Sequence, residues 1–232
     1  MSIYEGADVL ENLADLHNYN EGLRRAVSRG LVGNRVLDFG AGSGTFAHLL
    51  ETETRKVLCL EPDTSLRGRL EASGFEARES LEDFPETFFD SIYTLNVLEH
   101  IEDDMDVLRA LRDKIVERGH LVVFVPAHPW LFSSFDLRVG HVRRYRKAEL
   151  EAKIEAAGFE IITSRYFDSL GLLAAALYKL MDRGNGTLSP RALHFFDKRI
   201  FPFSLALDNF TKPFFGKNIL VSARSCSDAA KP

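Results

Sequence analysis

RVLDFGAGSGTFA, at residues 35–47, is the stretch that decides the fold of this chain. A short apolar run ends in Asp38, and three glycines follow at alternate positions, Gly40, Gly42 and Gly44. Short apolar runs bounded by turn residues are typical of buried strands. Glycines there let the backbone turn sharply and approach a ligand closely, and the helix that follows directs its free N–H groups to the same place. The stretch therefore predicts a strand, a cofactor-binding loop and a helix.

The spacing of the glycines distinguishes between classes of nucleotide site. A dinucleotide site favours G-x-G-x-x-G, whereas this chain has G-x-G-x-G shortly after the carboxylate of Asp38. A P-loop is excluded because no G-K-S or G-K-T follows. The carboxylate repels a pyrophosphate but suits an ammonium or sulfonium group. S-adenosylmethionine carries both charges and no phosphate, so the loop favours it over a nicotinamide dinucleotide.

A second acid supports the same cofactor. Residues 56–63 read KVLCLEPD, an apolar run that ends in Glu61, 21 residues after Gly40. In an open α/β sheet this carboxylate lies beside the first loop and accepts hydrogen bonds from both ribose hydroxyls. Asp63 is the better candidate to cap the next helix.

Three segments in this order resemble the class I S-adenosylmethionine-dependent methyltransferases: VLDFGAGSG, CLEPD and DSIYTLNVLEHIEDD at 90–104. The resemblance spans roughly residues 15–165. A looser likeness to bacterial small-molecule methyltransferases rests on NYN at 18–20 and GHVRRY at 140–145. The resemblance implies transfer of a methyl group to an O, N or C nucleophile of a small molecule. S-adenosylmethionine would be the cofactor and S-adenosylhomocysteine the product.

The resemblance also implies cofactor contacts outside the glycine loop. Ser80 and Leu81 follow the third strand and would contact adenine, although many members carry Asp in this loop. Asn96 follows the fourth strand, beneath the methionine part of the cofactor. Tyr19 and its neighbour Asn20 would touch the amino-acid end of the cofactor or simply pack as helix residues. The expected cofactor-binding residues are Tyr19, Asp38, Gly40, Ala41, Gly42, Gly44, Glu61, Pro62, Ser80, Leu81, Asn96 and Val97.

Histidines and one tryptophan supply candidates for the acceptor side. His100 is the best general base by position, because imidazole titrates near neutral pH; the alternative is a structural bond from its ring to the backbone. His128 and Trp130 leave the fifth strand and would stand over the transfer site. An aromatic face there stabilises a cation by about 0.5–2 kcal/mol, or Trp130 packs beneath the aromatic segment that comes later in the chain.

The GHVRRY segment supplies the remaining acceptor-side candidates. Two arginines next to a helix start oppose the helix dipole, and arginine binds carboxylate or phosphate in bidentate pairs. One interpretation is an anionic acceptor, such as an acid or a phosphorylated or lipid-linked sugar; the other is salt bridges to Asp136, Glu149 or Glu151. The candidate catalytic residues are His100, His128, His141 and Tyr145, and the candidate acceptor-binding residues are Trp130, His141, Arg143, Arg144 and Tyr145.

Strands and helices alternate along the chain, which predicts a doubly wound, mostly parallel, seven-stranded α/β sheet. We expect a single domain over 1–232, with an N-terminal helical cover at 1–33, a cofactor-binding core at 34–167 and the last strand at 217–225. Within it, expected strands lie near 35–39, 56–61, 75–79, 89–95, 120–126 and 159–166. Expected helices lie near 7–30, 45–53, 64–73, 103–117, where Asp103 and Asp104 form the cap and first turn, and 147–157.

Residues 168–216 depart from this alternation. They are rich in Phe and contain several Gly and Pro breakers, which predicts a helical insertion before the last strand. Because it leaves from the ligand-binding edge of the sheet, the insertion is placed to form a lid over the acceptor pocket. Core packing, a dimer interface and shallow contact with anionic lipid are the alternatives. Membrane contact is not favoured, and we expect a monomer or homodimer.

The composition argues against a nucleic-acid-binding, a disulfide-rich or a membrane-spanning protein. The chain has 232 residues, 45% of them hydrophobic, and a net charge of −5, which argues against a nucleic-acid partner. Cys59 and Cys226 do not indicate a disulfide framework, so we expect a reducing compartment. The acidic N-terminus is no signal peptide, and the longest apolar run, 170–177, is too short to span a bilayer. These features predict a cytoplasmic protein.

No His, Cys and Asp cluster has metal-ligand spacing along the chain, so the sequence predicts no metal. Two rivals to the methyltransferase remain. One is a nicotinamide-dependent Rossmann oxidoreductase, which the glycine spacing and Asp38 disfavour. The other is a methyltransferase-like binding or scaffold protein without turnover, which the intact glycine loop and Glu61 disfavour.

Overall fold

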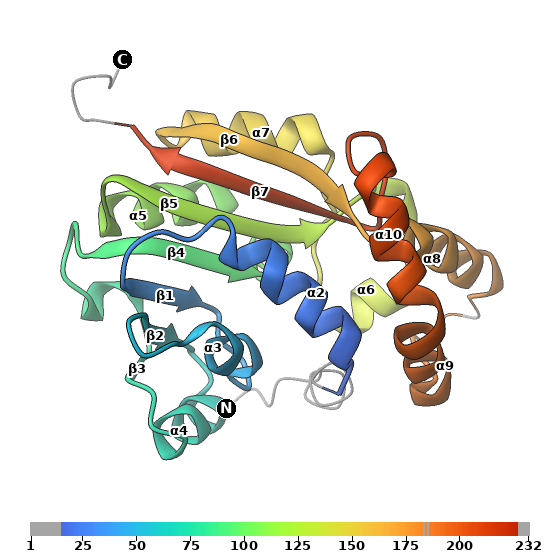
Figure 1. The fold of residues 1–232 in the computed structure, drawn as a ribbon, viewed down its shortest axis with the longest axis horizontal. Helices are drawn as coiled ribbons and strands as arrows, with labels where there is room; N and C mark the ends of the chain where they lie inside the picture. Colours follow the sequence, from blue (N-terminus) through green and yellow to red (C-terminus); the bar gives the residue numbers. More distant parts are fainter. Residues whose placement is uncertain (1–14, 183, 185, 227–232) are drawn as a thin grey trace.

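The computed structural model describes residues 15–182, 184 and 186–226. Its centre is a seven-stranded sheet in the order β3-β2-β1-β4-β5-β7-β6 (Figure 1). β7 runs antiparallel to both of its neighbours, and the other pairs are parallel. The strands are β1 (Arg35–Phe39), β2 (Lys56–Leu60), β3 (Ala77–Arg78), β4 (Phe89–Leu95), β5 (Ile115–Pro126), β6 (Phe159–Phe167) and β7 (Asn218–Ser225). The predicted fold class is confirmed.

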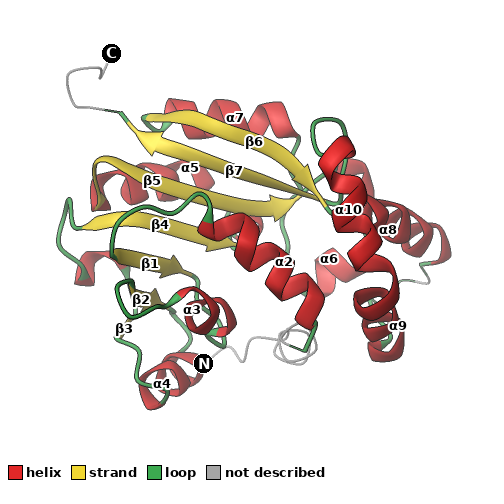
Figure 2. Cartoon of the chain, viewed as in Figure 1, coloured by secondary structure: helices red, strands yellow, loops and turns green. Residues whose placement is uncertain are grey.

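Helices cover both faces of this sheet (Figure 2). The α-helices in the described residues are α2 (His17–Ser28), α3 (Thr45–Leu50), α4 (Thr64–Ala72), α5 (Asp104–Lys114), α6 (Ser134–Arg138), α7 (Lys147–Ala156), α8 (Ser169–Met181), α9 (Pro190–Phe195) and α10 (Phe201–Thr211). Short 3-10 turns are η1 (Leu81–Asp83), η2 (Leu98–His100) and η3 (Pro129–Leu131), and η4 (Phe196–Ile200) is a π-helical turn. No helix in this part of the chain is long and apolar enough to cross a membrane.

Because the side chains of the central strands alternate between the two faces of the sheet, the protein has two hydrophobic cores, one on each face. Successive side chains of a strand point to opposite faces. On β4, Ile92 packs with α5 and α7, whereas its neighbour Tyr93 packs with α2, α3 and α4. Both residues are fully buried. The sheet is therefore covered on both sides, as the sequence of a doubly wound fold requires.

Several expected boundaries differ from the structure. The helix predicted at 103–117 ends at Lys114, because Ile115 is already buried in β5 and pairs with Phe89 of β4. Asp103 occupies the cap position of that helix without a capping hydrogen bond from its side chain. β3 is only two residues long, and α3 ends at Leu50. The first part of the helix predicted at 7–30 lies outside the described residues.

The helical insertion between β6 and β7 is present as predicted, and consists of α8, α9, η4 and α10. Its phenylalanines do not all pack into a core. Phe201 is fully buried, but five other phenylalanines of the insertion are exposed, namely Phe195, Phe203, Phe210, Phe214 and Phe215. The insertion therefore presents an apolar outer surface.

One side chain of the insertion ties it to the N-terminal helix. Asp197 of η4 is buried, and its carboxylate accepts hydrogen bonds from the backbone N–H groups of Asn18, at 3.2 Å, and Tyr19, at 2.8 Å. These are first-turn amides of α2, which has no side-chain cap of its own. Next along α2, Gly22 lies so close to α10 that an added Cβ would be 2.9 Å from Leu205 Cδ1. A residue about 180 positions away thus serves as the N-cap of α2.

Candidate functional site

The glycine loop between β1 and α3 needs glycine at each of its three positions. Gly40, Gly42 and Gly44 have φ values of 82°, 55° and 81°, in the left-handed region that side chains disfavour. A Cβ on Gly40 would also lie 2.4 Å from Val97 Cγ2, so the loop touches the residue that follows β4. The loop backbone is therefore held at the carboxyl ends of β1 and β4.

Glu61 fixes this loop to the end of β2. The side chain is buried, and Oε2 accepts a hydrogen bond of 2.7 Å from the Gly42 N–H while Oε1 accepts one of 2.9 Å from Asp63 N–H. Burial raises the pKa of Glu61, and these two bonds oppose the rise. A carboxylate has about four acceptor positions, so two remain for a ligand. Asp63 caps α4 through Ser65 and Leu66, as predicted.

Asp38 lies one strand away from Glu61. It is 3% exposed, and in the sheet register its neighbours are Cys59 of β2 and Tyr93 of β4. Burial raises the pKa of Asp38 to about 7, and the charge of Glu61 adds to the rise. Two acids thus lie at neighbouring strand ends beside the glycine loop, where the sequence predicted them.

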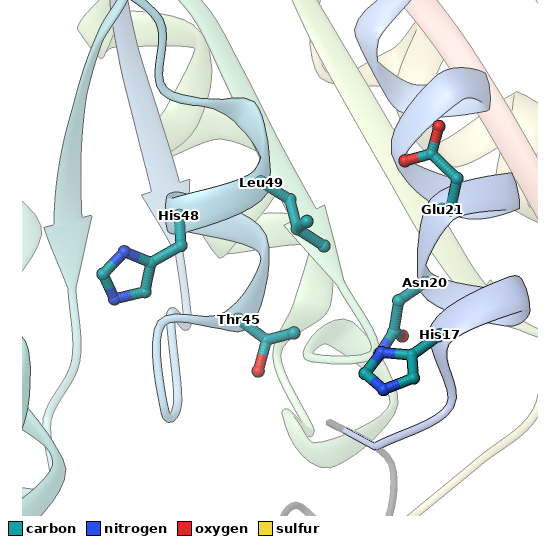
Figure 3. A pocket seen from close by; sticks show the side chains of 6 residues that line it. All are labelled: His17, Asn20, Glu21, Thr45, His48 and Leu49. Carbon is teal, nitrogen blue, oxygen red and sulfur yellow. The ribbon is translucent and has the colours of Figure 1, made fainter.

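A pocket of about 310 Å³ opens between α2 and α3, directly after the glycine loop (Figure 3). In Figure 3, His17 and Asn20 of α2 lie across from Thr45 and Leu49 of α3, while His48 points away. The lining residues are His17, Asn20, Glu21, Thr45, His48 and Leu49. The predicted contact residue Asn20 is therefore in the pocket.

The other predicted cofactor residues differ in whether their side chains are accessible or are engaged within the protein. Tyr19 packs its ring against Phe167 and Phe201, with centroid separations of 5.9 and 5.1 Å, which favours the packing alternative. Ser80 turns its hydroxyl to Glu82 at 2.5 Å and precedes η1. Ala41, Pro62, Leu81, Asn96 and Val97 are all at least partly accessible. Their contacts with a cofactor stay predictions.

Three non-glycine residues with positive φ follow the ends of three strands of the sheet. Asn96, His128 and Asp168 follow β4, β5 and β6 with φ of 56°, 63° and 63°. Those strands are mutually parallel, so the three residues lie along one edge of the sheet. Strained backbone of this kind gathers at functional sites, and this edge is where ligands bind in α/β sheets.

His128 and Trp130 are placed differently by the structure. His128 is half-buried, stacks on Tyr166 at 5.3 Å between ring centroids, and has Nε2 3.0 Å from the Gly216 carbonyl oxygen. Burial lowers its pKa. The Trp130 side chain is 57% exposed, so it does not pack beneath the aromatic segment. Trp130 is accessible to an acceptor, whereas His128 is largely used in packing.

The structure of the GHVRRY segment contradicts the predicted pocket role of Tyr145. It also favours salt bridges over anion binding for the two arginines. Tyr145 is fully buried, with its hydroxyl 2.8 Å from Asp104 Oδ2, so it is a core residue and not a pocket residue. Burial and Asp104 raise its pKa well above the usual value. Arg144 forms a bidentate pair with Asp136 at 2.7 and 2.9 Å, which is the salt-bridge alternative. Arg143 lies 3.2 Å from Asp104, a partner that the sequence did not indicate.

His100 and His141 meet edge to face, with ring centroids 4.7 Å apart. His100 Nδ1 lies 3.2 Å from the Gly140 carbonyl oxygen, which is the predicted structural bond. Burial and the neighbouring His141 lower the pKa of His100 to about 4, so its imidazole is neutral at neutral pH. His141 Nδ1 lies 2.8 Å from Asp136 Oδ1.

Sequence reasoning missed Glu99, which lies between these residues. The side chain is fully buried, and burial raises its pKa to about 8. Its signal in the sequence is an acid inside the segment NVLEHI, between Leu98 of the core and Ile101, which packs against the core. An acid in that position has to be paired or protonated, because an isolated buried charge is unfavourable.

Comparison with known proteins agrees with this arrangement. A family model described as a methyltransferase domain matches residues 10–164. The chain belongs to the methyltransferase domain family. The match includes the glycine loop, both strand-end acids and the segment containing Glu99, so this chain's site occupies the part of the methyltransferase domain that the family model describes.

Two curated relatives share part of this methyltransferase domain. The ubiquinone biosynthesis O-methyltransferases of two Aliivibrio fischeri strains are each 30% identical over 105 residues, which is 40% of this chain and 44% of the relative. The chain therefore spans less than half the length of the curated relatives that it matches.

Solved structures share the fold across nearly the whole methyltransferase domain. An S-adenosylmethionine-dependent methyltransferase from Archaeoglobus fulgidus has a TM-score of 0.62 at 19% identity, covering 91% of this chain and 95% of the other. One from Mesorhizobium loti has a TM-score of 0.59 at 19% identity, covering 87% and 95%. A cyclase also matches, with a TM-score of 0.59 at 17% identity, covering 88% and 80%. These likenesses establish the fold alone.

Proposed function

We propose that this protein transfers a methyl group from S-adenosylmethionine to a nucleophile of a small-molecule acceptor. The observation that carries the proposal is the Glu61 carboxylate, which is fixed by Gly42 and Asp63 at the mouth of a glycine loop and keeps acceptor positions for a ribose. Family membership supports the same cofactor. A nicotinamide dinucleotide would place a pyrophosphate near Asp38, and two like charges there repel each other.

The residues present fit a sulfonium nucleoside by their chemistry. Glu61 would accept the ribose hydroxyls, and the bare backbone of Gly40 and Gly42 allows close approach, since a side chain at position 40 would meet Val97. Asp38 would offset the positive charge of the amino-acid part. The pocket between α2 and α3, which contains Asn20, adjoins the same loop.

The protein's own contribution to methyl transfer would be positioning and exclusion of water. When bound, S-adenosylmethionine supplies a methyl group on an activated, positively charged sulfur. Correct alignment of two reactants can lower a barrier by about 7–11 kcal/mol. Asn96, His128 and Asp168 carry strained backbone along the edge where an acceptor would lie. A rigid backbone along this edge would help to hold the acceptor in a fixed position.

A neutral hydroxyl acceptor has more support than an anionic one. The charge of Arg144 is compensated by Asp136, and Arg143 is paired with Asp104, which also binds Lys153. Both guanidinium groups therefore already have a carboxylate partner within the protein. The curated relatives are named as O-methyltransferases. Trp130 is the exposed aromatic residue placed to contact such an acceptor.

We also propose that the insertion 168–216 and the N-terminal helix together form the acceptor-side cover of a single domain. The bonds from Asp197 to Asn18 and Tyr19 support a common cover, because they join the two segments directly. The divisions at 34–167 and 217–225 then correspond to the cofactor-binding core and the last strand.

Calorimetry of the full chain with S-adenosylmethionine, S-adenosylhomocysteine and NAD tests the proposed cofactor. We expect stoichiometric binding of the first two and none of NAD; tight NAD binding alone would favour an oxidoreductase. Incubation with methyl-labelled cofactor and an extract of small molecules then tests turnover. Binding without any labelled product in such extracts would favour a scaffold protein.

A further inference from the structure

Three potential metal ligands come together behind the proposed transfer edge. One potential ligand atom from each of Glu99, His100 and His141 lies within 4.8 Å of the other two. Glu99 and His100 belong to η2, directly after β4, and His141 follows α6. We propose that these three side chains bind one divalent transition-metal ion, for which zinc has the most suitable chemistry.

The state of Glu99 is the first argument for an ion. Both carboxylate oxygens are buried, and neither has a hydrogen-bond partner among the residues that the structure describes. The nearest polar group of the cluster is His141 Nε2, 3.8 Å from Oε1. Buried polar groups nearly always have a partner, and buried charges are paired or coordinate metals. A cation between Glu99 and the histidines supplies the missing partner.

The partners of the two imidazoles are the second argument. His141 Nδ1 is held by Asp136 Oδ1 at 2.8 Å, and His100 Nδ1 by the Gly140 carbonyl oxygen at 3.2 Å. Each acceptor favours the tautomer with its hydrogen on Nδ1, which places the ring lone pair on Nε2. Metal-binding histidines characteristically donate their other ring N–H to a carboxylate or a backbone carbonyl. Both kinds of outer partner are present here.

The charge around the cluster is compatible with a dication. Arg144 is the cation next to it, but its guanidinium is bound in two hydrogen bonds by Asp136. The carboxylate that Glu99 forms when it is ionised has no such compensation among the described residues. Addition of a divalent ion would therefore neutralise a buried carboxylate rather than add to an existing excess of positive charge.

The ligand set selects the class of metal. Two imidazole nitrogens and one carboxylate suit zinc and its first-row neighbours, whereas magnesium and calcium prefer oxygen ligands alone. Ligands at about 2.0–2.1 Å from a tetrahedral zinc lie about 3.3 Å apart, so the separations in the cluster have to shorten by about 1.5 Å at most. Three protein ligands leave one position open, as in catalytic rather than structural zinc sites.

Metal binding by the full, chelator-stripped chain tests this proposal. Zinc titrated against a chromophoric chelator should bind at one equivalent per chain. Glu99→Gln and His141→Gln should each weaken zinc binding by at least about 100-fold, and Asp136→Asn by about 10–100-fold. His194→Gln, on α9, is the matched control and should leave zinc affinity unchanged. Circular dichroism establishes that each variant is folded.

Two results would overturn the proposal. One is the absence of stoichiometric zinc binding by the wild type at micromolar zinc. The other is zinc affinity that survives in folded Glu99→Gln and His141→Gln proteins. If those variants do not fold, imidazole NMR of the wild type decides: zinc must shift the ring signals of His100 and His141, and shifts confined to other histidines would refute the site.

The inference stands apart from the methyltransferase proposal. S-adenosylmethionine calorimetry on the same stripped samples separates the two: zinc binding without cofactor binding would remove the proposed function and retain this site, and the converse would do the opposite. Along the chain His141 lies 41 residues beyond His100, so the sequence predicts no metal. The fold closes this distance.

Discussion

At the scale of a single residue, Glu61 has two roles. Its carboxylate would bind a ribose, and it also accepts the hydrogen bonds that hold Gly42 and Asp63 in place. Glu61→Gln retains the shape but replaces one acceptor oxygen by a donor. Hydrogen bonds to charged groups contribute about 1.5–3 kcal/mol. We therefore expect the S-adenosylmethionine Kd to rise at least about tenfold in calorimetry. The exposed neighbour Glu76 provides the control Glu76→Gln, and an equal loss in both variants would contradict the assignment.

Asp38 should make cofactor binding dependent on pH. The pKa of about 7 means that the free protein carries mostly the neutral acid at pH 6 and mostly the carboxylate at pH 7.5. A cationic ligand requires the carboxylate, so affinity should increase as pH rises, by about eightfold over this range. The range ends below the pKa of an ordinary α-amino group. Calorimetry of Asp38→Asn should give a flat profile; a wild-type affinity that falls over this range contradicts the role.

Glycine substitutions at two sites should change stability in opposite directions. Gly40→Ala meets Val97 at 2.4 Å and places a side chain at φ 82°, so we expect about 1–3 kcal/mol of destabilisation. Gly68 is inside α4 with nothing within 4 Å of an added Cβ. Gly68→Ala should therefore stabilise the protein by about 0.5–1 kcal/mol. Denaturant unfolding measures both, and equal signs would show that the loop is not constrained as described.

The residues that sequence could assign are those whose role follows from local geometry. Gly40, Asp38 and Glu61 occupy fixed positions at strand ends, so a spacing rule is sufficient to find them. Arg144 and Tyr145 are different, because their roles depend on Asp136 and Asp104 from other elements. The sequence offers Asp136, Glu149 and Glu151 as partners for the arginines, but no local pattern indicates which of them Arg144 will bind.

At the scale of elements, the start of α8 depends on an acid from α10. Asp208 is buried and accepts hydrogen bonds from the N–H groups of Asp168, at 2.7 Å, and Ser169, at 2.9 Å. Asp168 in turn accepts a bond from the Ser204 hydroxyl. This junction fixes the insertion to the end of β6.

Removal of the Asp208 carboxylate should be costly for stability. Asp208→Ala leaves two buried N–H groups unpaired, at about 1–3 kcal/mol each. We expect a loss of about 2–4 kcal/mol, which lowers the Tm by roughly 5–15 °C. Asp106 has an exposed side chain on α5, and Asp106→Ala should change stability by less than about 0.5 kcal/mol. Calorimetric unfolding of both variants gives the comparison; similar Tm values would refute the junction.

Element types were predictable from periodicity, and boundaries less so. The apolar runs of β1 and β2 are bounded by turn residues, and their predicted ends agree with the structure within a residue. At the end of α5 the helix pattern continues through residues 115–117, but Ile115 contributes more when paired with Phe89 in the sheet. Tertiary pairing therefore overrode a local helix signal.

At the scale of the molecule, the first described helix and the insertion before the last strand are coupled. Asp197 caps α2, and Gly22 of α2 packs closely against Leu205 of α10. Sequence could predict helices in both segments, but not that one segment would cap a helix of the other. The expected strength of such a cap is about 0.5–2 kcal/mol.

Hydrogen exchange can test this coupling directly. In Asp197→Ala, amide protection should fall at Asn18 and Tyr19, which lose their acceptor, and also along α10 if the two segments open together. The exposed neighbour Lys198 provides the control Lys198→Ala, in which protection should stay at the wild-type level. Loss confined to α10, with Asn18 and Tyr19 unchanged, would contradict the cap.

The cap supplied by Asp197 has a consequence for anyone who recombines this protein with its relatives. Exchange of the segment between β6 and β7 to change the acceptor would also remove the acid that starts the first described helix. A working chimera would have to take both segments from the same parent, or introduce a capping side chain in place of Leu16. The unit that can be exchanged between relatives therefore consists of two segments that are far apart in the sequence, α2 and the insertion between β6 and β7.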